Sequence, residues 1–157
     1  MFEEDGLSIR AFRVDHSPIE PAVGYRFDYK GRSVAVSGDS IVTKDYREAV
    51  ENVDLLLADA LSEVLVSKMS EALSANGNER TSKLIRDVLD YHASTTSLVE
   101  MAKQAKVGQL AFYHMVPMPT NAFTEKVFRR GVPEEVIITD DGTRFVLPAD
   151  SDEIIIQ

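Results

Sequence analysis

Apolar and polar residues alternate through the first part of the chain, as they do in half-buried β-strands. Residues 7–11 alternate one by one, and residues 24–29 and 33–37 are two further β-prone runs separated by Lys30-Gly31. We therefore predict strands over most of the first forty residues. After Lys44 the spacing becomes helical, and the short apolar run 54–57 then predicts a buried strand.

The middle of the chain has the periodicity of amphipathic helices. Apolar residues recur on one face between Leu65 and Leu73 and again between Leu84 and Leu89, with Asn76-Gly77-Asn78 as a break between the two segments. This pattern predicts a hairpin of two helices. Ser94 or Thr95 can cap a third helix that runs to Gln104.

The last third returns to mixed structure. We predict a strand over 109–113, a loop at Pro117 and Pro119, and a helix over 121–130. Strands over 136–139 and 143–147 are joined by Asp140-Asp141-Gly142, a sequence typical of β-hairpins. Strands that alternate with helices in this order predict an α/β fold with a mixed sheet and flanking helices.

Composition limits the chemistry that the chain can perform. The 157 residues are 44% hydrophobic and 27% charged, as in an ordinary globular domain, and they include no cysteine. Any metal must therefore be held by histidine and carboxylate. No apolar run is long enough to span a membrane, and no export signal precedes the first strand, so we expect a cytoplasmic location by default. A full-length parent protein could still be exported.

The net charge argues against one class of partner. Acidic residues outnumber basic ones by 26 to 17, which gives a formal charge of −9. A surface of that sign repels a phosphate backbone unless its basic residues are clustered, and the densest basic pair is only Arg129-Arg130. On this ground we expect nucleic acid to be an unlikely partner and a small molecule to be the substrate.

The candidate chemistry lies at predicted strand ends. The three histidines, His16, His92 and His114, each lie beside carboxylate, proline or hydroxyl residues, and Asp39 follows the strand that ends near Ser37. The carboxyl ends of strands are where sites collect in open α/β sheets. Each residue also has a simpler interpretation, because histidine is common on surfaces and Gly38-Asp39 is compatible with an ordinary turn.

Several short runs together resemble one known family. The runs are Val14-Asp15-His16-Ser17-Pro18, Gly24-Tyr25-Arg26-Phe27, Gly31 to Ser40, Asp90-Tyr91-His92-Ala93-Ser94 and Ala111 to Pro117. Their order and approximate spacing resemble the second half of metallo-β-lactamase-fold hydrolases of the RNase Z-like and arylsulfatase-like branch. The resemblance implies half of an αββα sandwich, with a mixed sheet and flanking helices.

The resemblance also implies roles for five residues. His16 and His114 would each bind one of two divalent metal ions, Zn²⁺ or Mn²⁺, and Asp39 would bridge both. His92 would stabilise or protonate the departing oxygen, with help from Asp59. The implied reaction is metal-assisted hydrolysis, in which the metal lowers the pKa of water.

Two departures from the family pattern stand out. In the His-Glu-Ala-type motif after the central strand, Ala58 replaces the histidine and Asp59 the glutamate, which puts a complete RNase Z proton relay in doubt. The His-x-His-x-Asp-His stretch of the first half is absent, so each ion would have about two protein ligands, whereas catalytic zinc usually has three. We therefore expect residues 1–157 to be a single partial domain that is inactive in isolation.

These departures shape the expected function and partners. An apolar sheet face should be left for the N-terminal half of the fold or for self-association. Only about ten residues separate the Gly-Tyr-Arg segment from Gly38-Asp39, too few for a substrate-gripping insertion. We expect a small ester, sulfate or phosphodiester substrate. The alternatives are a non-catalytic relic or interaction module and a fragment of an RNase Z-type tRNA 3′-processing endonuclease.

Overall fold

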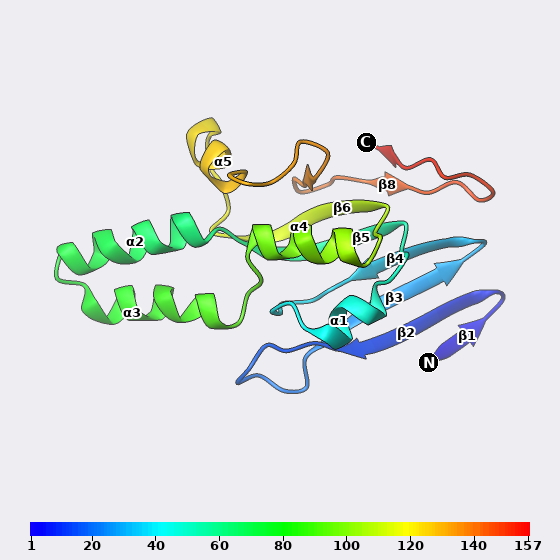
Figure 1. Cartoon of the computed structure of the whole chain (residues 1–157), viewed down its shortest axis with the longest axis horizontal. Coiled ribbons are helices and arrows are strands. Elements are labelled where there is room, and N and C mark those ends of the chain that lie inside the picture. The colour runs from blue at the N-terminus through cyan, green and yellow to red at the C-terminus, as the bar shows by residue number, and fades with distance from the viewer.

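The computed structural model describes all 157 residues and is built on one seven-stranded sheet (Figure 1). The strands follow the order of the sequence across this sheet, and a separate two-stranded ribbon ends the chain. The sheet strands are β1 (Phe2–Glu4), β2 (Leu7–Arg13), β3 (Val23–Tyr29), β4 (Arg32–Val36), β5 (Leu55–Leu61), β6 (Gln109–Val116) and β7 (Ile137–Ile138); β8 (Phe145–Val146) and β9 (Ile155–Ile156) form the ribbon.

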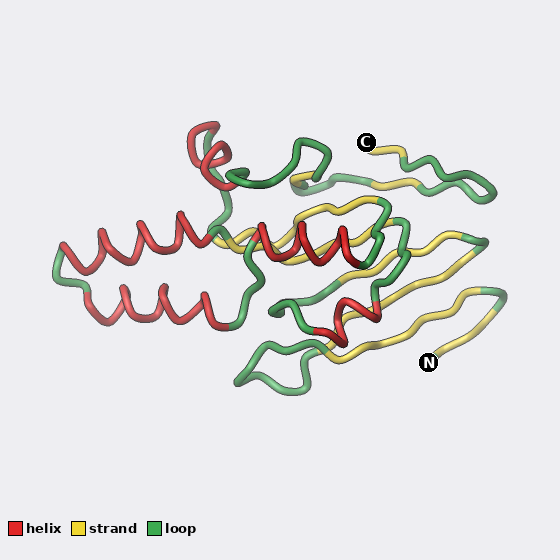
Figure 2. The backbone as a smooth tube through the Cα atoms, in the orientation of Figure 1, coloured by secondary structure: helices red, strands yellow, loops and turns green.

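Five α-helices and one short 3₁₀ helix connect these strands (Figure 2). Serine, threonine and asparagine side chains cap several of them; the hydroxyl of Ser94, for example, accepts a hydrogen bond from the backbone N–H of Ser97. The helices are α1 (Lys44–Ala49), α2 (Glu63–Ala75), α3 (Glu79–Asp87), η1 (Val88–Asp90), α4 (Thr95–Gln104) and α5 (Ala122–Phe128). None of them is both long and apolar enough to cross a membrane.

Strand direction brings four strand ends to one edge. β1 to β4 are antiparallel neighbours, whereas β4, β5, β6 and β7 are parallel. Because two antiparallel steps separate β2 from β4, β2 runs in the same direction as β4, β5 and β6. The carboxyl ends of these four strands therefore meet at the same edge of the sheet, called here the site edge.

One face of the sheet carries the hydrophobic core. Helices α1 and α4 lie over this face, and the side chains between them and the strands are almost completely buried. Successive side chains on a strand point to opposite faces, so one alternate set from each strand forms this core. Its members include Ala35, Leu56, Ala58, Leu98, Met101, Leu110 and Phe112.

The other alternate set forms an apolar face over which no helix packs. Over β2, β3 and β4 its apolar side chains are intermediate or exposed, and Tyr25 and Tyr29 are each 45% exposed. We call it the bare face; it comprises Leu7, Ile9, Ala11, Tyr25, Phe27, Tyr29, Val34, Val36 and Leu57. A contiguous apolar surface of this kind is typical of an interaction surface.

Helices α2 and α3 form the predicted helical hairpin, but they extend away from the sheet (Figure 1). Hydrogen bonds between Ser70 and Ser82, both buried, join the two helices. Arg86 donates to the Ser70 hydroxyl from the next turn of α3. Hydrogen bonds among these three side chains therefore join the two helices.

The end of the chain differs from the sequence prediction. The expected hairpin between 136–139 and 143–147 is wrong: β7 pairs with β6, and β8 pairs with β9, a strand that the sequence analysis did not predict. The turn itself forms, because Thr143 N donates to Asp140 O. Its strands separate because Thr139 is bonded through both its N–H and its hydroxyl to Phe112 O on β6.

Candidate metal centre

All five site residues predicted from the sequence lie at the site edge. His16 follows β2, Asp39 follows β4, Asp59 is within β5, His114 is within β6, and His92 precedes α4. The imidazole ring of His92 lies 5.2 Å from that of His16 and 5.6 Å from that of His114, measured between centroids. Residues up to about a hundred positions apart in sequence are thus brought together by parallel strand ends.

Asp39 is positioned by a glycine turn at the end of β4. Gly38 has φ +66°, and a Cβ atom added there would lie 2.9 Å from the carbonyl oxygen of Val23. Only glycine adopts this conformation without strain and also leaves room for the neighbouring backbone. The Gly38-Asp39 pair is therefore a required turn that presents the carboxylate at the site edge, where it is partly exposed.

His114 is positioned by an irregularity in β6. Asp59 pairs with Tyr113 and Ala60 pairs with Met115, so His114 has no partner residue on β5. Its φ is +43°, an uncommon conformation for a residue with a side chain. A bulge of this kind redirects a side chain, and here Nδ1 of His114 lies 3.2 Å from Oδ1 of Asp39. Both side chains of this pair are substantially exposed.

Asp59 and His92 form a second, buried pair. Nδ1 of His92 lies 2.7 Å from Oδ2 of Asp59, and the Asp59 side chain is completely buried. The other carboxylate oxygen of Asp59 has no hydrogen-bond partner. Burial raises the pKa of Asp59, and the nearby charge of Asp39 raises it further, whereas the hydrogen bond from His92 acts to lower it.

His16 is oriented by the backbone. Its Nδ1 lies 2.9 Å from the carbonyl oxygen of Tyr91. A carbonyl oxygen only accepts hydrogen bonds, so Nδ1 of His16 carries the proton in this contact and Nε2 keeps its lone pair. The edge of the Tyr91 ring also packs against the His16 ring, with centroids 5.1 Å apart.

Two sets of three side chains converge closely enough to hold an ion. His16, Asp39 and His92 form one set, and Asp59, His92 and His114 form the other; within each set the potential ligand atoms lie within 4.8 Å of one another. Imidazole nitrogen and carboxylate oxygen suit Zn²⁺ or Mn²⁺. The donors present therefore fit a divalent metal, and His92 belongs to both sets.

Tyr113 is a further residue of the site edge that the sequence analysis did not single out. It is the register partner of Asp59 on the adjacent strand. Burial raises the pKa of its phenol, and the charges of Asp59 and Asp39 raise it further. Strand alternation could have identified it, because side chains two positions apart on a strand face the same side of the sheet. Tyr113 therefore faces the same side as Ala111, the partner of Leu57, and lies beside Asp59.

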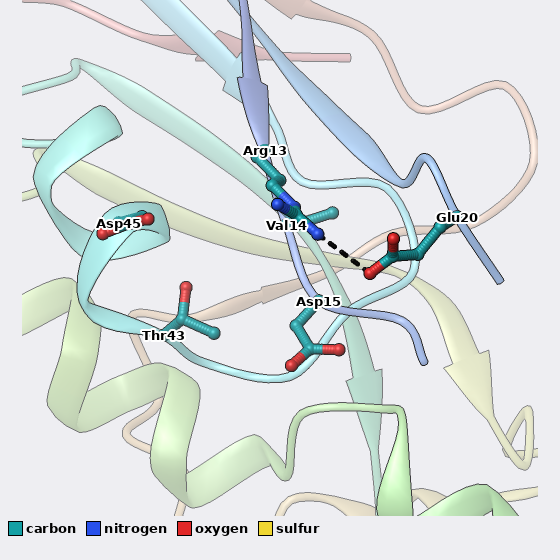
Figure 3. Close-up of a pocket in the computed structure, with 6 residues that line it drawn as sticks. All are labelled: Arg13, Val14, Asp15, Glu20, Thr43 and Asp45. Carbon is teal, nitrogen blue, oxygen red and sulfur yellow. Dashed lines mark hydrogen bonds and ion pairs between the residues drawn. The ribbon is translucent and has the colours of Figure 1, made fainter. Parts of the chain in front are cut away.

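A separate polar pocket lies beside the site (Figure 3). Arg13 and Glu20 form an ion pair of 2.9 Å across it. Asp15 accepts hydrogen bonds from the N–H and the hydroxyl of Ser17, and the backbone hydrogen bond is the main cause of its lowered pKa. Because these charged groups already have partners within the chain, the convergent histidines form the stronger candidate centre.

Sequence comparison finds relatives over most of this chain. A ribonuclease Z of Mycobacterium avium is 29% identical over 117 residues, which are 74% of this chain and 38% of that protein. A putative ribonuclease Z of Mycobacterium tuberculosis is 27% identical over 116 residues, 74% of this chain and 47% of that protein. The chain thus aligns with less than half the length of these relatives. No protein-family model matches it.

Solved structures show the same fold. The metallo-β-lactamase fold protein YhfI from Bacillus subtilis matches with a TM-score of 0.60 at 17% identity, over 90% of this chain and 50% of that one. Human tRNase Z, short form, matches with a TM-score of 0.56 at 17% identity, over 89% and 42%. Zn²⁺-bound PqqB from Methylobacterium extorquens matches with a TM-score of 0.53 at 16% identity, over 85% and 44%.

These comparisons confirm the fold class expected from the sequence, a mixed α/β arrangement of the metallo-β-lactamase type. They give no support to the expectation that nucleic acid is an unlikely partner, because the sequence relatives are named as ribonucleases. The chain thus has the metallo-β-lactamase fold, and its sequence is similar to ribonucleases Z over 74% of its length.

Proposed function

We propose that this chain is the carboxy-terminal half of a metal-dependent hydrolase whose site is completed by ligands from outside residues 1–157. The observation that carries the proposal is the convergence of three histidines and two aspartates at one edge of the sheet. The meeting of strand ends does not by itself require five polar side chains to face one another, and imidazole with carboxylate is the donor set of hydrolytic metal sites.

Each residue has a role in this proposal. His16, Asp39 and His114 would hold two divalent ions, Zn²⁺ or Mn²⁺, with Asp39 between them. Bound ions would polarise the substrate and lower the pKa of water. With Nδ1 donating to Asp59, a His92 ring that is protonated on both nitrogens would deliver its Nε2 proton to the departing oxygen and be left as neutral imidazole. The buried carboxylate of Asp59 orients the ring and stabilises its charged form.

A further segment of the fold would account both for the missing metal ligands and for the uncovered bare face. The resembled family supplies most ligands from a His-x-His-x-Asp-His stretch that is absent here, and the sequence relatives are more than twice the length of the aligned region. The bare face would be covered by the sheet that carries those ligands. Asp59 shares this face with Leu57, so one added layer would cover the apolar surface and close over the site.

The favoured substrates are small phosphodiesters, esters or sulfates. A chain with a net charge of −9 is poorly suited to a long polyanion, and few residues separate β3 from the Asp39 turn. Precursor tRNA is the second candidate, because the sequence relatives are ribonucleases Z. A non-catalytic relic is the third, since Ala58 and Asp59 depart from the family motif.

The test joins the chain to the segment that it lacks. The chain would be fused to the N-terminal half of the Mycobacterium avium ribonuclease Z and assayed with Zn²⁺ or Mn²⁺ on bis-p-nitrophenyl phosphate and on precursor tRNA. We expect phosphodiester turnover that EDTA abolishes. Asp39→Asn should reduce turnover to background, and His92→Ala should reduce it by about 10²- to 10⁴-fold. Asp45→Asn, an exposed carboxylate on α1, is the matched control.

The outcomes separate the candidates. Turnover that survives Asp39→Asn would contradict the assigned role of this carboxylate. Faster cleavage of precursor tRNA than of the small diester would favour the ribonuclease. A well-folded fusion that binds metal and turns over neither substrate would favour the relic. In the source genome, a reading frame upstream of Met1 that encodes His-x-His-x-Asp-His would independently support the hydrolase.

A further inference from the structure

We infer that Ser37 is a positioning residue of the site, because its hydroxyl holds the Asp39 turn and the backbone of Asp59 at a fixed spacing. Ser37 is completely buried at the end of β4. The inference rests on the proposed function, in which Asp39 holds the metal ions and Asp59 orients His92. Ser37 acts through these two aspartates and is itself neither a ligand nor an acid in that reaction.

The parallel ladder between β4 and β5 ends at Ser37. Its last register pair is Val36 with Leu57, and the N–H of Ser37 donates to the carbonyl of Leu57 at 3.0 Å. In a continuous parallel ladder, the next N–H of β5 that faces β4, that of Asp59, would donate to the carbonyl of Ser37. That carbonyl lies against β3 instead, since a Cβ atom added to Gly24 would be only 2.9 Å from its oxygen.

The hydroxyl of Ser37 takes the place of this carbonyl. The N–H of Asp59 donates to Ser37 Oγ at 3.1 Å, and the hydroxyl donates its own hydrogen to the carbonyl of Gly38 at 2.6 Å. A serine hydroxyl has one hydrogen and two acceptor lone pairs, so it can make both bonds at once. The Gly38 carbonyl belongs to the peptide unit that leads into Asp39. A single oxygen atom therefore ties the two aspartates together.

This link sets the relation between the two histidine contacts of the site. Asp39 lies 3.2 Å from Nδ1 of His114, and Asp59 lies 2.7 Å from Nδ1 of His92. A shift of one aspartate relative to the other would change the spacing of these two contacts. Without the hydroxyl, the buried N–H of Asp59 would also lose its hydrogen-bond partner, which favours such a shift.

Ser33, at the other end of β4, makes a similar contact and is the matched control. Its hydroxyl accepts from the N–H of Asp54 at 3.0 Å, as that of Ser37 accepts from Asp59. Both serines are buried. The Ser33 contact lies at the edge of the sheet opposite the site edge, so its loss removes a comparable bond without reaching the histidines.

NMR of the purified chain tests the inference without a catalytic assay. In the original chain we expect the backbone amide of Asp59 to exchange slowly with solvent, and the Nδ1–H of His92 to give a hydrogen-bonded proton signal. Ser37→Ala should speed exchange at Asp59 by about tenfold or more and should shift the His92 signal. Ser33→Ala should leave both observations unchanged. Urea unfolding of the two variants shows whether their stabilities are comparable.

Three results would overturn the inference. The first is an Asp59 amide that exchanges in the original chain as fast as an unstructured one; this measurement needs no variant, so it remains decisive if Ser37→Ala does not fold. The second is an unchanged His92 signal in folded Ser37→Ala. The third is an equal change of that signal in Ser33→Ala, which would indicate a general loss of stability.

The fusion with the N-terminal half of the Mycobacterium avium ribonuclease Z gives a second readout. In this fusion, Ser37→Ala should lower kcat for bis-p-nitrophenyl phosphate by about 10- to 100-fold, as removal of a supporting group does, with little change in KM. Ser33→Ala should keep the original kcat, and equal kcat values for the two variants would contradict the inference. A fusion that is inactive in every form would refute the proposed function, and the NMR comparison would still decide whether Ser37 positions Asp59 and His92.

Discussion

An aspartate lies at each edge of the sheet, and the two carboxylates have opposite environments. At the site edge, Asp59 is fully buried, and one of its oxygens has no hydrogen-bond partner. At the opposite edge, Asp54 directly precedes the same strand, and it accepts from the N–H and the hydroxyl of Ser33 and lies 3.4 Å from Nε of Arg32. Asp59 therefore has an oxygen without a hydrogen-bond partner, whereas Asp54, five positions earlier, accepts two hydrogen bonds and faces a guanidinium group.

The pKa values reflect this difference. Burial acts to raise the pKa of Asp54, but the Ser33 hydrogen bonds and the charge of Arg32 outweigh it, so the pKa is lowered. For Asp59, burial dominates and the pKa is raised. Nη1 of Arg32 also donates to the carbonyls of three residues near the end of the chain, Pro148, Ser151 and Glu153. The carboxylate at the opposite edge is therefore stabilised in its charged form, whereas the carboxylate at the site edge is not.

The largest expected effect is the difference in stability between two variants in which Asp54 or Asp59 is replaced by asparagine. Asp54→Asn should lower the free energy of unfolding by about 2–3 kcal/mol, because it removes the charge that Arg32 faces in a buried position. Asp59→Asn should not lower it at pH 7, because asparagine keeps an acceptor for His92 and removes a buried charge. Urea unfolding followed by circular dichroism measures both. Equal losses of unfolding free energy in the two variants would contradict the inferred difference between the two edges.

A pair of glycines at the two ends of β4 gives the next effect. Gly31 and Gly38 both have positive φ, but a Cβ atom at Gly31 would meet nothing within 4 Å, whereas one at Gly38 would lie 2.9 Å from Val23 O. Gly31→Ala should cost about 1 kcal/mol of strain. Gly38→Ala should cost at least about 1 kcal/mol more, because backbone atoms must move. Identical costs, measured by the same unfolding experiment, would show that the turn before Asp39 can adapt.

The smallest effect is a difference in pH dependence. The pKa of Asp54 is lower in the folded chain than its ordinary value of 3.8, so its stabilisation is present above that value and is lost as pH falls through the folded pKa. The pKa of Asp59 is raised, so its contribution is present below 3.8 and is lost as pH rises through the folded pKa. Unfolding free energies at several pH values would be compared between the original chain and each asparagine variant.

For each variant, the difference in unfolding free energy between the original chain and the variant can be plotted against pH. The two plots should slope in opposite directions. The stability advantage of the original chain over Asp54→Asn should grow as pH rises across the acid range, and its advantage over Asp59→Asn should shrink. Curves that slope the same way would mean that the two carboxylates have similar environments, in conflict with their different hydrogen bonding.

Local sequence patterns predicted much of the fold. The alternation of residues 7–11 became β2, the Asn76-Gly77-Asn78 break separates α2 from α3, and Ser94 caps α4. These features depend on neighbours within a few positions, which a sequence displays directly. The position of Asp39 after its strand was also predicted, and the strand ends converge because β4, β5 and β6 are joined by helical crossovers and so run parallel.

Features that depend on distant partners could not be predicted in this way. The hairpin predicted at Asp140-Asp141-Gly142 does not form, because its first strand pairs with β6 and its second strand pairs with β9. The bulge that directs His114 arises from a register shift against β5, and His16 is oriented by the carbonyl of Tyr91, 75 positions away. None of these contacts leaves a signal in the residues next to it.

Under the proposed function, the bare face would link the exposure of apolar surface to the completion of the site. Without a covering layer it presents Tyr25, Phe27 and Tyr29 to water, a surface that attracts chaperones and other chains. The layer that would cover it is the same one proposed to bring the remaining ligands. Under the proposed function, the layer that covers this apolar surface would also complete the site, so assembly and activity would depend on the same contact.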